Sequence, residues 1–136
     1  MAYTKPIGVA FTDQDISGAN IVLVDEQLGY TTEGQGTVTQ ATSKSTAVTL
    51  NKPAGQITMN NASLATATNV TFTFNNSFIS VNDILILNVA AGATAGAYNC
   101  WVSSLSVGSA TVTVRNISGG SLSEAVVINF ALIHCV

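Results

Sequence analysis

Residues 42–59 read TSKSTAVTLNKPAGQITM, and they decide whether this part of the chain is a polar linker or part of a sheet. Ser and Thr are frequent, yet the side chains of this stretch follow a period of two. Ala47 and Thr49 fall on one side, whereas Val48 and Leu50 fall on the other. Successive side chains of a strand point to opposite faces, so this alternation predicts a strand.

The residues NKPAG that follow are typical of a turn. Pro53 fixes φ near −65° and Gly55 permits a positive φ, so we expect a hairpin loop between residues 50 and 56. Ile57 and Met59 then begin the next strand. Thr suits the wet face of such a sheet because its β-branched shape fits a pleated surface while its hydroxyl meets water. The stretch is therefore expected to be sheet surface and not a disordered stalk.

Short runs of strand-forming residues recur from Gly36 to the C-terminus. The runs of Val, Ile, Thr and Phe are GTVTQ, STAVTL, QITMN, NVTFTFN, ILILNVA, AYNCWVSSL, SATVTVRNI and AVVINFALIH. They are short and recur at the spacing of about 8 to 12 residues that all-β sandwiches show. No stretch of comparable length has the helical period. We predict an all-β fold, an antiparallel, jelly-roll-like β-sandwich over residues 36–136.

Alternation with Thr and Asn also predicts which side chains face the core. In NVTFTFN and SATVTVRN the apolar residues share one face and the Thr residues share the other. The predicted inward set is Val70, Phe72, Phe74, Val112, Val114, Ile128 and Phe130. The segments AAGATAG at 90–96 and GGSLSE at 119–124 are predicted loops between strands.

Residues 1–35 differ from the rest of the chain. Most of the acidic residues lie here, including Asp13 and Asp15, and no strict alternation appears before ANIVLVD. We interpret this segment as an extended N-terminal arm plus one strand, of the kind that contacts a neighbouring molecule. A plain edge strand folded onto its own domain is the alternative.

Composition excludes several classes of partner. Only 8% of the residues are charged and 47% are hydrophobic, which speaks against disorder driven by charge. Four scattered cations, Lys5, Lys44, Lys52 and Arg115, cannot form a basic patch, so we expect no nucleic-acid binding. The longest apolar runs, IVLV and ILIL, are far too short to span a bilayer, and the N-terminus lacks the apolar core of a secretory signal. We expect a soluble protein with no membrane partner.

The reactive side chains do not form a recognisable site. Cys100 and Cys135 are expected to be free thiols, and with His134 they match no zinc spacing. Catalysis by Ser needs a base held by a third group, and His134 is the one His in the chain. Asp13 and Asp15 lack the rest of a calcium loop. We therefore predict no enzyme activity, no catalytic or metal-binding residues and no cofactor, with His134 an ordinary strand residue and Trp101 in the core or an interface.

Three stretches carry a family resemblance: TQATSKSTAVTLNKPAGQITMNNASL, AAGATAGAY and RNISGGSLSEAVVINFALI. Over about residues 36–133 the sequence resembles a module of tailed-bacteriophage virion proteins, which are small capsid-surface or fibre-associated proteins and the ends of longer fibres. The resemblance implies a β-sandwich displayed on a virion, often as a symmetric oligomer. It supplies no catalytic residues.

Two functions follow from this resemblance. The first is a capsid decoration protein on the outer surface of the head, which binds the major capsid protein and stabilises the assembled capsid. Residues 1–35 would be its anchoring or subunit-linking arm. The second is a tail fibre or spike head whose loops at 90–96 and 119–124 bind a host receptor, although the aromatic side chain nearest these loops is Tyr98. A polysaccharide hydrolase would need paired carboxylates that the sequence does not offer. The apolar composition with few charges further predicts a homo-oligomer, and the many threefold positions of a capsid favour a trimer.

Overall fold

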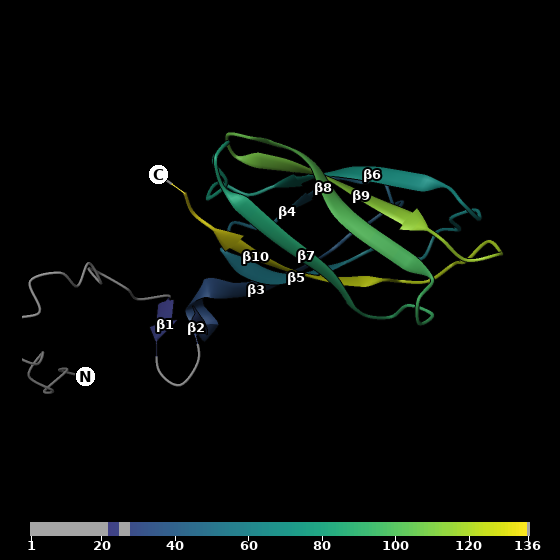
Figure 1. The fold of residues 1–136 in the computed structure, drawn as a ribbon, viewed down its shortest axis with the longest axis horizontal. Helices are drawn as coiled ribbons and strands as arrows, with labels where there is room; N and C mark the ends of the chain where they lie inside the picture. Colours follow the sequence, from purple (N-terminus) through teal and green to yellow (C-terminus); the bar gives the residue numbers. More distant parts are fainter. Residues whose placement is uncertain (1–21, 25–27, 136) are drawn as a thin grey trace, which may run out of the picture.

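The structure is a computed structural model, and it describes residues 22–24 and 28–135. Figure 1 shows two layers of strands stacked face to face. One sheet has the strand order β3-β5-β10-β7 and the other has the order β4-β6-β9-β8. The predicted all-β sandwich is confirmed.

The strands are short and few residues separate them. The N-terminal part holds β1 (Val22–Val24), β2 (Leu28–Tyr30) and the short 3-10 helix η1 (Thr32–Gly34). The first sheet is built from β3 (Gln35–Thr39), β5 (Ala54–Thr58), β10 (Val127–Ile133) and β7 (Ile84–Ala91). The second sheet is built from β4 (Val48–Thr49), β6 (Asn69–Asn75), β9 (Ser109–Asn116) and β8 (Tyr98–Ser106).

The core lies between the two sheets, where the period-two pattern places it. Six of the seven side chains predicted to face inward are buried, and Val70 packs partly buried against them. In β4 and its flank, Val48 is buried and Leu50 packs against the core, whereas Ala47 and Thr49 are exposed. The predicted faces are therefore confirmed, including those of the stretch at 42–59.

The chain changes sheet at almost every connection. From β3 to β8, each strand lies in the sheet opposite to that of the strand before it. Among the strands of the sandwich, the one hairpin is formed by β8 and β9. The prediction of a hairpin at residues 50–56 is therefore wrong, because β4 and β5 belong to different sheets. The crossing also makes two edge pairs parallel, β3 with β5 and β4 with β6, where a purely antiparallel sandwich was expected.

Gly55 has a different role from the turn predicted for it. It lies inside β5, opposite Gly36 of β3 in the parallel pair. A Cβ atom at Gly55 would stand 2.1 Å from the carbonyl oxygen of Gly36. Glycine is thus required because the two backbones approach too closely for any side chain.

The loops at one end of the sandwich are held by buried polar side chains. Lys44 is 3% exposed, and its ammonium donates hydrogen bonds to the carbonyl oxygens of Asn60 and Glu124, each at 2.5 Å. Burial lowers the pKa of Lys44, while the nearby Glu124 carboxylate opposes this shift. Gln40 also supports this loop, donating to the carbonyls of Lys44 and Thr46, both at 2.9 Å. The Ser- and Thr-rich stretch is therefore ordered around one buried cation.

The N-terminal segment reaches the sandwich through a short hairpin. β1 and β2 pair antiparallel, and β3 begins at Gln35, one residue before the predicted start of the sandwich domain. The rest of the predicted arm, with Asp13 and Asp15, lies outside the described residues. Within the described part of the chain, no helix is long and apolar enough to cross a membrane.

Candidate functional site

Large apolar side chains are exposed together at one end of the sandwich. They come from the β6–β7 loop, the start of β7, the β8–β9 turn and the end of β10, and we call them the apolar end: Phe78, Val81, Ile84, Val107 and Ile133. Val107 is 82% exposed and Val81 is 58% exposed. Figure 1 shows the β6–β7 loop, the β8–β9 turn and the C-terminus at the same end of the molecule. Several large apolar side chains exposed at one end of a molecule suggest an interaction surface.

Hydrogen bonds hold the segments of the apolar end next to one another. The Asn76 amide N–H donates to the carbonyl of Gly108 at 2.9 Å, and the Gly108 N–H donates to the carbonyl of Ile79 at 2.9 Å. These bonds join the β6–β7 loop to the β8–β9 turn. In the first sheet, Ile84 lies directly opposite Ile133. The apolar end is therefore a fixed surface and not a set of independent loops.

A buried carboxylate ties the C-terminus to this end. The Asp83 side chain is completely covered, and its Oδ1 lies 2.8 Å from Nδ1 of His134. Asp83 also accepts hydrogen bonds from the backbone N–H and hydroxyl of Ser80, both at 2.8 Å, and from the Cys135 N–H at 3.0 Å. His134 follows the last residue of β10, so its prediction as an ordinary strand residue is wrong. It is the partner of Asp83.

These contacts predict a loss of stability in acid that depends on Asp83. Burial raises the pKa of Asp83, but the hydrogen bonds from Ser80 and Cys135 and the nearby His134 outweigh it and lower the pKa to about 2. A pKa below the unfolded value of 3.8 stabilises the fold above that value, and this contribution disappears as the pH falls through the folded pKa. Between about pH 4 and pH 2, Asp83→Asn should therefore lose less stability than the natural protein.

Urea unfolding at a series of pH values checks this expectation. Asp83→Asn should be the less stable protein at pH 6, and the difference should shrink towards pH 2. Glu33→Gln is the comparison variant: hydrogen bonds from its own backbone and from Thr31 also lower the pKa of Glu33, but its side chain is exposed, so removing its charge should change the acid dependence less. An Asp83→Asn protein with the same acid dependence as the natural protein would contradict the assignment.

The N-terminal segment enters the sandwich at the apolar end. β3 starts beside the start of β5 and the end of β10, since Gln35 pairs with Ala54, which in turn pairs with Ala131. The Tyr30 hydroxyl donates to the carbonyl of Leu132, one residue before Ile133. The Lys52 ammonium donates to the carbonyl of Glu33 at 2.7 Å. The segment before β3 and the exposed apolar side chains thus share one end.

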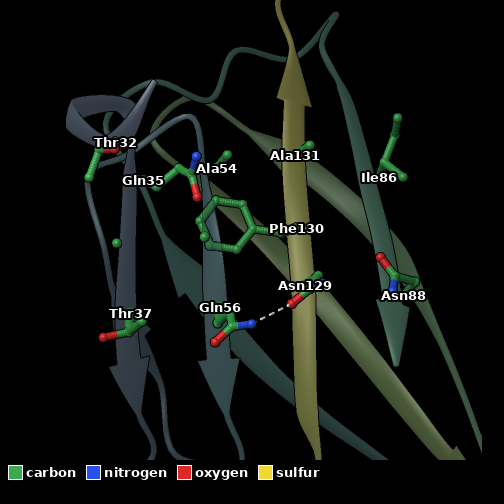
Figure 2. Close-up of a pocket in the computed structure, with 12 residues that line it drawn as sticks. Thr32, Gln35, Thr37, Ala54, Gln56, Ile86, Asn88, Asn129, Phe130 and Ala131 are labelled. Atoms are coloured by element: carbon green, nitrogen blue, oxygen red, sulfur yellow. Dashed lines mark hydrogen bonds between the residues drawn. The ribbon is translucent and has the colours of Figure 1, made fainter. Parts of the chain in front are cut away.

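A second feature lies on the outer face of the first sheet. A hollow of about 630 Å³ lies over β3, β5, β10 and β7, and Figure 2 shows the side chains that line it. Thr37, Gln56, Asn129 and Asn88 form a row across it, because each is paired with the next in the register of the sheet. Gln56 Nε2 donates to Asn129 Oδ1 at 3.0 Å. Among the described residues, none that lines the hollow carries a charged side chain.

Of the remaining residues considered in the sequence, Cys135 lies at the apolar end through its N–H bond to Asp83, whereas Cys100, Trp101 and Tyr98 belong to neither feature. Cys100 on β8 and Cys135 after β10 are free thiols, and burial raises the pKa of Cys100. Trp101 is 37% exposed on β8, so it does not lie in the core. Tyr98, the aromatic nearest the predicted binding loop at 90–96, is buried and offers no exposed ring there.

The surfaces above contain no cluster of metal-ligating side chains. Among residues 22–24 and 28–135, no group of three or more His, Cys, Asp or Glu residues is placed to hold a metal ion. The apolar end and the hollow were both missed by sequence reasoning, because each joins residues that are distant along the chain. Comparison with family models, with curated proteins and with solved structures finds no match to this chain.

Proposed function

We propose that the protein is a virion structural protein of a tailed bacteriophage, a decoration protein that binds the outside of the assembled capsid. The proposal joins the sequence resemblance to one structural observation. Among the described residues, five of the nine exposed large apolar side chains lie at the end where the N-terminal segment enters the sandwich, whereas Ile117 lies at the opposite end. A molecule built this way has one end suited to binding a partner surface.

The opposite end has the character of a surface that faces solvent. Its loops at 92–97 and 117–126 consist largely of Gly, Ala, Ser and Thr. Glu124 accepts hydrogen bonds from the backbone and hydroxyl of Thr94, and Asn116 donates to the carbonyls of Leu64 and Gly120. These hydrogen bonds satisfy several polar groups of the loops within the domain itself. We therefore place the apolar end on the major capsid protein and the other end outward.

Residues 1–35 act with the apolar end as the anchor, and the assembled unit is a homo-oligomer, a trimer on the threefold positions of the capsid. Low charge supports close packing of copies, because only 8% of the residues are charged and like-charge repulsion between neighbours is weak. Closed symmetry is the common form of such assemblies. Exposed Ile84 and Ile133, side by side at the sheet end, provide apolar area for these contacts.

Deletion of residues 2–30 tests the anchor. The sandwich should stay folded, because all eight of its strands begin at Gln35 or later, yet the truncated protein should no longer bind capsids that lack the protein. Circular dichroism reports the fold, and co-sedimentation with capsids reports binding. Full occupancy by the truncated protein would contradict the anchor, and a full-length protein that sediments as a monomer at all concentrations would contradict the oligomer.

A further inference from the structure

The hollow on the first sheet has a lining that selects for uncharged ligands. Its volume of about 630 Å³ falls within the range of small-molecule sites. Amide and hydroxyl side chains supply its polar groups, and none of the described Asp, Glu, Lys, Arg or His residues is part of the lining. An ionic ligand would lose its hydration there without gaining an opposite charge, which is costly.

Several polar groups in the hollow are left without a protein partner. The Gln56–Asn129 bond uses one amide nitrogen and one amide oxygen, which leaves Oε1 of Gln56 and Nδ2 of Asn129. Asn88 lies next in the row, and its exposed side chain takes part in no hydrogen bond among the described residues. The row thus presents donors and acceptors side by side. Hydroxyl groups match such a row, because each hydroxyl donates and accepts.

Small apolar groups lie beside the polar row. Ile86, Ala131 and Ala54 occupy the neighbouring row of the sheet, since Ala131 pairs with both of the others. Figure 2 shows these three side chains above the Gln56–Asn129 pair, towards the start of β5 and the end of β10. An apolar strip next to a row of amides fits a ligand that has C–H faces and hydroxyl edges.

We propose that this hollow binds a neutral oligosaccharide. The polar row crosses four strands, and neighbouring strands lie about 4.8 Å apart, so the row is about 14 Å long. That length suits several linked sugar rings better than a single ring. An extended peptide fits less well, because peptides add to sheets through unpaired edge backbone, whereas β5 and β10 at the centre of the hollow are paired on both sides. The inference does not depend on the proposed capsid role.

The experiment uses the full-length ¹⁵N-labelled protein and two probes, maltotetraose and cellotetraose. Titration at millimolar concentrations with at least one probe should shift the side-chain amide signals of Gln56, Asn88 and Asn129 in heteronuclear NMR spectra. Asn88→Ala should weaken the binding about tenfold, the loss expected for hydrogen bonds to one amide. The fold should be unaffected, because the Asn88 side chain is exposed and makes no hydrogen bond within the described chain.

Asn99→Ala is the matched control. Asn99 is also an exposed Asn on an edge strand, but it lies on β8 in the other sheet, so this variant should bind as the natural protein does. The proposal is overturned if neither probe shifts these signals, or if Asn88→Ala binds as tightly as the natural protein. It is also overturned if a Thr- and Asn-rich peptide shifts the three signals and neither tetrasaccharide does.

Discussion

Phe74→Ala is expected to lower the free energy of unfolding by about 3–5 kcal/mol, as truncation of a fully buried aromatic side chain does. Phe74 on β6 is 0% exposed, and its ring lies edge-on to that of Phe130 on β10, with centroids 4.8 Å apart. The pair joins the two sheets, because β6 and β10 belong to different layers. The substitution would therefore leave a cavity in the middle of the core.

Urea unfolding measures this effect, with the slope of the transition unchanged if the variant remains two-state. Phe78→Ala is the matched control. Phe78 is the same residue type four positions later, yet it is 47% exposed, so its truncation should cost less than about 1 kcal/mol. Equal losses for the two variants would contradict the placement of the core.

Much of the fold was predictable because alternation carries direct information about faces. Phe72 and Val112, for example, lie between Thr neighbours in the sequence and face the core in the structure. Alternation does not say which strand pairs with which, however. Pro and Gly between two strands are compatible with a connection from one sheet to the other as well as with a hairpin. The segment at 50–56 connects β4 in one sheet to β5 in the other.

The two candidate surfaces depend on pairings that the sequence does not display. Val81 and Val107 lie in different loops, which come to the same end of the sandwich where hydrogen bonds join the β6–β7 loop to the β8–β9 turn. Asn88 and Gln56 share a row only through β10, which comes last in the chain. The burial of Lys44 could not be predicted from the sequence either, because a Lys among Ser and Thr is normally exposed. Here its ammonium is buried because it donates hydrogen bonds to two backbone carbonyls.

The second large effect is expected at the apolar end. Val81→Asp combined with Val107→Asp would bury two unpaired charges in the proposed interface with the capsid, which costs several kcal/mol. A loss of about 3 kcal/mol corresponds to more than a hundredfold weaker binding. The fold should tolerate the pair, because both side chains are more than half exposed in the free protein.

The matched control adds the same two charges at the opposite end. Ala95→Asp combined with Ser123→Asp uses exposed positions in the β7–β8 and β9–β10 loops, which the proposal turns away from the capsid. Thermal unfolding of both double variants confirms that each is folded before binding is compared.

Co-sedimentation with purified capsids that lack the protein tests the central claim most directly. The account predicts that Val81→Asp/Val107→Asp fails to bind at concentrations that saturate the natural protein, while Ala95→Asp/Ser123→Asp reaches full occupancy. Full occupancy by the Val81→Asp/Val107→Asp variant, or loss of binding by the control alone, would contradict it.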